Sequence, residues 1–225
     1  MRTARQVGRD IAIWLAKQLT ESGFPARTFY GESFTVWLWS LFPGEFSQEL
    51  EFLLPYALEQ LSRQDDQAHP EFNLFALLNY CRSASLPPKS IIRSFPNLRD
   101  TASTNWILLG TVDRLLWNHL TGEKHFSEIS LRLNTRLLLL LQQQSDGLIR
   151  DDRLFARRVP IPFPWHIVEG LDIRYAPRLR KMSLQYHCFS LALLWDIFKL
   201  TEWKELRAVI ERGINGILPF ILPNG

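Results

Sequence analysis

Residues 150–181 carry the side chains best suited to chemistry, because basic residues outnumber acidic ones there by eight to four. A run of this kind is either a solvated loop or a surface that binds anions. Asp151 and Asp152 stand within it, and glycoside hydrolysis requires such a pair of carboxylates. The same two side chains are equally able to form exposed ion pairs with neighbouring arginines. The basic residues of the run are Arg150, Arg153, Arg157, Arg158, Arg174, Arg178, Arg180 and Lys181.

The segment from Gln142 to Asp152 connects this basic run to a strongly apolar stretch in which residues 137–141 are all leucine. The Asp146-Gly147 pair inside it is a signal for a turn at the end of a helix. A buried helix that stops here is predicted to present the loop after it at the rim of a helical array. That loop, residues 146–176, is far longer than most connections, and long ordered loops usually have a function.

Helical periodicity dominates the chain, and the alternation typical of strands is nearly absent. Helices 124–144 and 177–199 are apolar around their circumference, so we expect neighbours to cover them on all sides. Helices 3–21 and 202–218 are amphipathic. This alternation predicts an all-α fold, an α/α toroid built as an incomplete double ring of antiparallel helix pairs. The predicted helices span 3–21, 33–42, 46–63, 70–84, 101–120, 124–144, 177–199 and 202–218.

Composition favours one domain over residues 1–225, possibly the N-terminal part of a longer protein, with 46% hydrophobic residues. The net charge of +3 points to no nucleic acid, and the oligomeric state is left open. Cys81 and Cys188 are predicted to be buried free thiols, which suits a reducing compartment. No apolar run reaches the roughly 18 residues of a membrane span, and no signal peptide is visible. We therefore expect a cytoplasmic location.

Three short motifs resemble a known family. Helices ending in Gln-x-x-Asp-Gly, here from Gln143, and in Pro-Asn-Gly look like the α/α-toroid carbohydrate enzymes. Thr104-Asn105-Trp106 is similar to the Asn-Trp element of polysaccharide lyases of the heparinase II/III, alginate and chondroitin type. Ser183-Leu184-Gln185-Tyr186-His187 resembles their Ser-x-x-Tyr-His element on an inner helix. The resemblance covers roughly residues 100–225.

This resemblance implies β-elimination, in which a base removes the proton α to a uronate carboxylate and the 4-oxygen leaves. Asn105 would then help to neutralise the carboxylate, assisted by Arg174 or Arg178, whose guanidinium groups match it. Two pairs compete as base and acid. One is His166 with Tyr175, whose spacing is similar to that of chondroitin-type lyases; the other is Tyr186 with His187.

Each of these residues also has a structural interpretation. Tyr186 and His187 sit on apolar helical stripes, where buried, hydrogen-bonded side chains are common. Asn105 is suited to capping its helix. Trp106 and Trp165 are candidate platforms for sugar rings, but most aromatic residues of such a chain belong to its core.

Several classes of site are absent from the sequence, namely phosphate-binding glycine loops, nucleophile elbows, His-Glu-x-x-His and Cys-x-x-Cys. We therefore expect no metal and no cofactor. The leading hypothesis is a lyase-like carbohydrate-active protein that acts on an acidic oligo- or polysaccharide. One alternative is a non-catalytic helical module that binds glycans or proteins in polysaccharide assembly. Another is an α/α-toroid glycoside hydrolase that uses Asp151 or Asp152.

Overall fold

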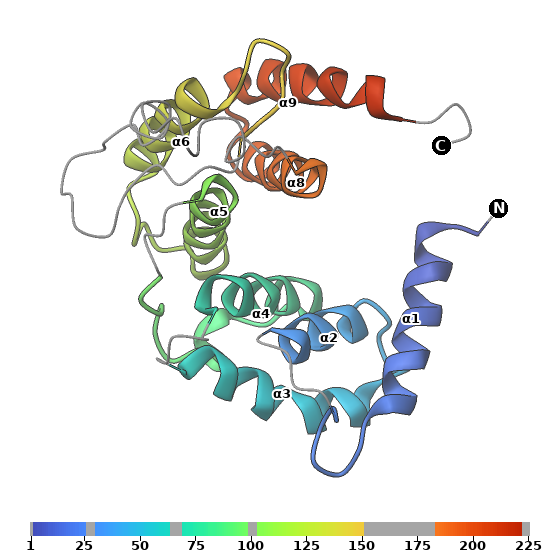
Figure 1. The fold of residues 1–225 in the computed structure, drawn as a ribbon. Helices are drawn as coiled ribbons and strands as arrows, with labels where there is room; N and C mark the ends of the chain where they lie inside the picture. The colour runs from blue at the N-terminus through green and yellow to red at the C-terminus, as the bar shows by residue number, and fades with distance from the viewer. Residues whose placement is uncertain (1, 26–29, 64–68, 99–102, 151–182, 222–225) are drawn as a thin grey trace, which may run out of the picture. The chain divides into compact units, whose positions relative to one another are not determined.

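The computed structural model describes residues 2–25, 30–63, 69–98, 103–150 and 183–221 (Figure 1). These residues form eight α-helices and two short 3-10 turns, with two isolated β-bridges and no strand. The predicted all-α class is therefore confirmed. The chain divides into two compact units, Met1–Arg99 with Trp117–Glu123 and Asp100–Leu116 with Lys124–Gly225.

The first unit is built on a pair of parallel helices, α2 (Gly31–Ser40) and α4 (Pro70–Ala84). Ser33 Oγ donates to Asn73 Oδ1 at 2.6 Å near the start of both helices, and Ser40 and Ser83 share a hydrogen bond near their ends. Helix α3 (Ser47–Ser62) packs on both. Because α3 connects the end of α2 to the start of α4, it runs back in the opposite direction to both.

Helix α1 (Ala4–Gln18) begins with a capping box. Thr3 accepts from the Gln6 backbone N–H while the Gln6 side chain accepts from that of Thr3, which satisfies two otherwise orphaned donors. The helix is held to α2 by a buried hydrogen bond of 3.0 Å from Trp39 Nε1 to the Ala12 carbonyl. This bond uses a carbonyl on the buried side of α1, where Ala12 itself has no exposed surface.

The second unit contains most of α5 (Thr104–Thr121), together with α6 (Glu128–Gln142), α8 (Leu184–Thr201) and α9 (Lys204–Ile217). Helices α8 and α9 form a tight antiparallel pair, since only two residues link them and Glu202 adopts a left-handed conformation with φ of 54°. Helices α6 and α9 run parallel. Trp203 Nε1 donates to Glu128 Oε1 at their starts, and Gln143, just after α6, donates to the Val209 carbonyl.

The described helices lie close to the predicted ranges, of which residues 101–102 and 177–182 are outside the described part of the chain. The expected burial of α6, α8 and Cys188 was wrong. Helix α8 was expected to be covered on all sides, but Tyr186 and Trp195 on it are 46% and 51% exposed. Helix α6 buries only one face, and its opposite side exposes a stripe of apolar residues. The buried positions follow the helical period, so the leucines between them point outward. The exposed ones are Ile129, Leu133, Leu137, Leu140 and Leu141.

The two cysteines also differ. Cys81 is buried in α4, and this burial raises the pKa of its thiol to about 11. Cys188, in contrast, is exposed on α8, so the expectation that both thiols are buried was wrong. No helix among the described residues is long and apolar enough to span a bilayer.

Leu194→Ala should lower the free energy of unfolding by about 2–5 kcal/mol, because Leu194 is fully buried in α8 and its truncation leaves a cavity. Leu140→Ala makes the same chemical change in the same unit at a side chain that is 80% exposed. Its effect should stay within about 0.5 kcal/mol. Urea unfolding of both variants measures this, and equal effects would contradict the assignment of the core.

Candidate functional site at the turn after helix α6

The chain reverses tightly after α6 and pairs with itself over residues 142–150. The Gln144 N–H donates to the Leu148 carbonyl at 2.9 Å, and the Arg150 N–H donates to the Gln142 carbonyl at 3.0 Å. Asp146 closes the turn by accepting from the Leu148 N–H at 3.0 Å, as Asx turns do. Gln143 and Ile149 form an antiparallel bridge between these bonds. The predicted turn is therefore a short hairpin at the end of a helix.

Glycine is required at position 147 for two reasons. Its φ of +88° lies in the left-handed region, and a Cβ at this position would collide with the Arg212 carbonyl oxygen of α9. The approach is matched from the other side, since a Cβ on Gly216 would lie 2.7 Å from the Asp146 carbonyl oxygen. Glycines on both partners thus let the turn lie directly on the backbone of α9.

The side chain of Gln143 fixes the turn to α9. Its Nε2 atom donates to the Gly147 carbonyl at 3.1 Å and to the Val209 carbonyl at 2.9 Å. Its Oε1 atom accepts from Arg212 Nη2 at 2.8 Å. The amide therefore uses both of its donors and its acceptor, which leaves the turn little freedom to rotate on the helix.

His187 joins the same turn to α8 and α9. The imidazole has no exposed surface. The Ile149 N–H donates to Nδ1 at 2.9 Å, and Nε2 lies 3.0 Å from the Gly213 carbonyl oxygen. Because Nδ1 accepts, a neutral ring carries its proton on Nε2 and donates it to Gly213. Both ring nitrogens are thus occupied by backbone groups.

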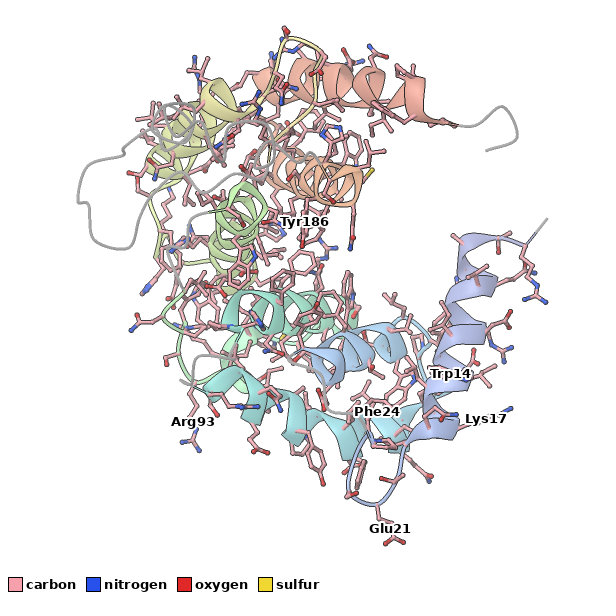
Figure 2. The ribbon with its side chains drawn as sticks, viewed as in Figure 1. Trp14, Lys17, Glu21, Phe24, Arg93 and Tyr186 are labelled. Atoms are coloured by element: carbon pink, nitrogen blue, oxygen red, sulfur yellow. The ribbon has the colours of Figure 1, made fainter. Side chains whose placement is uncertain are left out.

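Tyr186 precedes His187 and points elsewhere, because successive residues of an α-helix are about 100° apart. Its side chain is 46% exposed and lies on the side of α8 that faces away from α9 (Figure 2). Ser183 caps the helix by accepting from the Tyr186 N–H at 3.4 Å. The motif therefore separates into a buried histidine that holds backbone and an exposed tyrosine that is free to meet a ligand.

The Asn-Trp motif lies at the start of α5 in the same unit. Asn105 is buried, and its Oδ1 accepts from Ser103 Oγ at 2.6 Å. Trp106 is half-buried. The other predicted site residues lie outside the described residues: Asp151, Asp152, Trp165, His166, Arg174, Tyr175 and Arg178.

Gln142 and Arg150 are two polar residues of this turn for which no separate role was predicted. Gln142 closes α6 and is 2% exposed, while Arg150 is half-buried. Arg150 appeared in the sequence only as one charge of a basic run. Their symmetric position could have indicated that they pair across the turn, since each lies four residues from Asp146 in the chain, on opposite sides.

An ion pair reinforces the other end of the α6–α9 contact. Arg132 donates through Nε and Nη2 to the two carboxylate oxygens of Glu205, at 2.6 and 2.8 Å. These hydrogen bonds lower the pKa of Glu205 from 4.5 to about 2. The described residues contain no group of three His, Cys, Asp or Glu side chains that could hold a metal ion.

Two hollows help to locate the site. One of about 460 Å³ lies beside the turn, with Arg136, Gln143, Ser145 and Arg212 among its lining residues. A larger one of about 1050 Å³ belongs to the first unit and is lined by none of the predicted site residues. No protein-family model, curated protein or solved structure matches this chain.

Gly147→Ala should lower the free energy of unfolding by about 2–4 kcal/mol, combining left-handed strain with a forced shift of the α9 backbone. Gly122→Ala is the matched control, because Gly122 has a φ of +71° and nothing within 4 Å of the added Cβ. It should cost only the strain, about 1 kcal/mol. Denaturant titration compares the two, and equal losses would rule out the close approach.

The Arg132–Glu205 pair predicts a particular acid sensitivity. The folded pKa of Glu205 lies below its ordinary value, so its stabilisation is fully present above pH 4.5 and is lost as pH falls towards 2. Thermal unfolding of Glu205→Gln between these pH values should therefore show a weaker dependence on pH than that of the unmodified protein. An unchanged dependence would show that the pair contributes nothing.

Proposed function

We propose that the protein is a lyase-like carbohydrate-active protein that cleaves an acidic polysaccharide by β-elimination. One observation carries this proposal. The Gln143-x-x-Asp146-Gly147 and Ser183-x-x-Tyr186-His187 motifs suggested the family separately. They are brought close because the N–H of Ile149, two residues after Gly147, donates to His187. The histidine holds the turn, and the tyrosine beside it is exposed. This is the arrangement expected of a supported reactive side chain.

The order of helices supports an α/α toroid as the framework. Helix α2 runs parallel to α4 in the first unit, and α6 runs parallel to α9 in the second. In the second unit, α8 lies antiparallel to α9. Antiparallel helix pairs repeated in one direction are the building principle of such rings and arcs.

Within the proposal, Tyr186 is the residue that meets the reacting atoms. Its phenolate takes the proton α to the uronate carboxylate, the electron pair forms the new double bond, and the 4-oxygen leaves with its bonding electrons. The resulting phenol can then return that proton to the leaving oxygen. His187 acts as a positioning residue, since both of its ring nitrogens already hold backbone groups. The predicted carboxylate contact of Asn105 remains part of this proposal.

Incubation with a panel of acidic polysaccharides should produce absorbance at about 235 nm, since elimination creates an unsaturated uronate. Tyr186→Phe should reduce that rate by roughly 10²- to 10⁴-fold, the usual contribution of a general acid or base. Tyr30→Phe removes a hydroxyl from another partly exposed tyrosine, in the first unit, and should leave the rate unchanged.

The three functional hypotheses give different outcomes. Cleavage without absorbance would replace elimination with hydrolysis and direct attention to Asp151 and Asp152. Binding without any cleavage would favour the non-catalytic module. A rate that survives Tyr186→Phe would remove Tyr186 from the chemistry.

A further inference from the structure

Helix α6 exposes a continuous apolar stripe on the side opposite its buried face. Its members recur at intervals of three or four residues, which places them along one side of a helix. Leu140, at 80% exposure, is the most accessible of them. Soluble proteins seldom leave such a row uncovered, and a partner helix binds through anchors at this spacing. The α6 stripe consists of Ile129, Leu133, Leu137, Leu140 and Leu141.

A hollow of about 460 Å³ adjoins the stripe on the side nearer α9. Leu140 belongs to both the stripe and the hollow, so the two form one continuous surface. Interfaces gain most from a large side chain that enters such a hollow. The stripe with its hollow therefore suits a helix that inserts an anchor side chain. The apolar residues that line the hollow are Leu139, Leu140, Leu206 and Val209.

The edge of the stripe that faces α9 carries an excess of positive charge. Arg132 is held by two hydrogen bonds to Glu205. Arg136 lies near the same carboxylate but forms no hydrogen bond or ion pair with a described residue. Arg212 lines the hollow with Arg136 and donates to the neutral amide oxygen of Gln143. Three guanidinium groups thus share one carboxylate, which favours an acidic partner.

This charge argues against three other occupants of the stripe. An antiparallel second α6 would set the basic edge against the same edge of its copy, where like charges repel. Residues 151–182, which lie outside the described ranges, contain seven basic and four acidic residues, so their charge also repeats that of the edge. Helices that bind anionic lipid surfaces carry basic and aromatic residues. The stripe has no aromatic side chain, and its other edge carries Ser130 and Asn134.

We propose that the α6 stripe and the adjoining hollow bind an amphipathic helix of a partner protein, one whose glutamates or aspartates meet Arg136 and Arg212. The distance along α6 from Ile129 to Leu140 is about 16 Å, which about three turns of the partner helix would cover. No step of the proposed elimination uses this surface, so the partner would localise or regulate the protein without taking part in its chemistry.

A fluorescently labelled peptide helix of about four turns tests the proposal by anisotropy against the full chain. The peptide carries leucines at i, i+4, i+7 and i+11 and glutamates beside them along one edge. It should bind saturably. A matched peptide with lysines in place of the glutamates should bind on the order of 10-fold more weakly, because its charges face arginines.

Two variants with matched controls locate the binding surface. Leu140→Ala should weaken the acidic peptide about 10-fold, since it removes an anchor contact at a position where truncation leaves the fold intact. Leu218→Ala makes the same change at a leucine 55% exposed outside the stripe, and should leave binding unchanged. Arg136→Gln should weaken the acidic peptide several-fold and reduce its advantage over the lysine peptide. Arg207→Gln, at an exposed arginine outside the hollow, should do neither.

Four results would overturn the proposal. They are the absence of saturable binding by the acidic peptide, equal binding of the lysine peptide, unchanged binding in Leu140→Ala, and unchanged preference in Arg136→Gln. Two further measurements identify a different occupant and would overturn it as well. Self-association in sedimentation that is lost in Leu140→Ala would assign the stripe to a second copy. Binding to phosphatidylserine vesicles that is lost in the same variant would assign it to a lipid surface.

Discussion

The imidazole of His187 holds two backbone groups at once, the Ile149 N–H at Nδ1 and the Gly213 carbonyl at Nε2. Through these two bonds, one side chain of α8 ties the turn after α6 to the middle of α9. Buried backbone groups must find partners, and a short turn outside any sheet has few available. His187 provides these partners and thereby fixes the positions of the two residues that it bonds, Ile149 and Gly213.

Glycine makes this junction possible. The turn lies on α9 so closely that Gly147 meets the Arg212 carbonyl and Gly216 meets the Asp146 carbonyl. Gly213, which accepts the histidine proton, is itself packed against Leu191. The result is a rigid corner of backbone bonded to His187, and Tyr186, the preceding residue of α8, is exposed to solvent. An exposed polar side chain next to a rigidly held backbone is characteristic of functional sites.

The parts of the fold that the sequence predicted are those that depend on local patterns of residues. The helices follow from apolar periodicity, and the Asp146-Gly147 turn follows from residue type, because both depend on near neighbours in the chain. The role of His187 could not be predicted in this way. Its partners lie 38 and 26 residues away and are backbone groups, which no residue type identifies. The coverage of α6 was overestimated for a related reason: apolar composition does not tell which of several leucines faces a neighbour. Cys188 was misjudged in the same way.

In the proposed function, Tyr186 meets the reacting carbon of an acidic sugar. A crystal structure of the Tyr186→Phe protein with a uronate tetrasaccharide tests it most directly. We expect the ring of residue 186 to lie beside the sugar carbon that bears the acidic proton. A sugar bound elsewhere on the chain, with the turn unchanged and unoccupied, would contradict it.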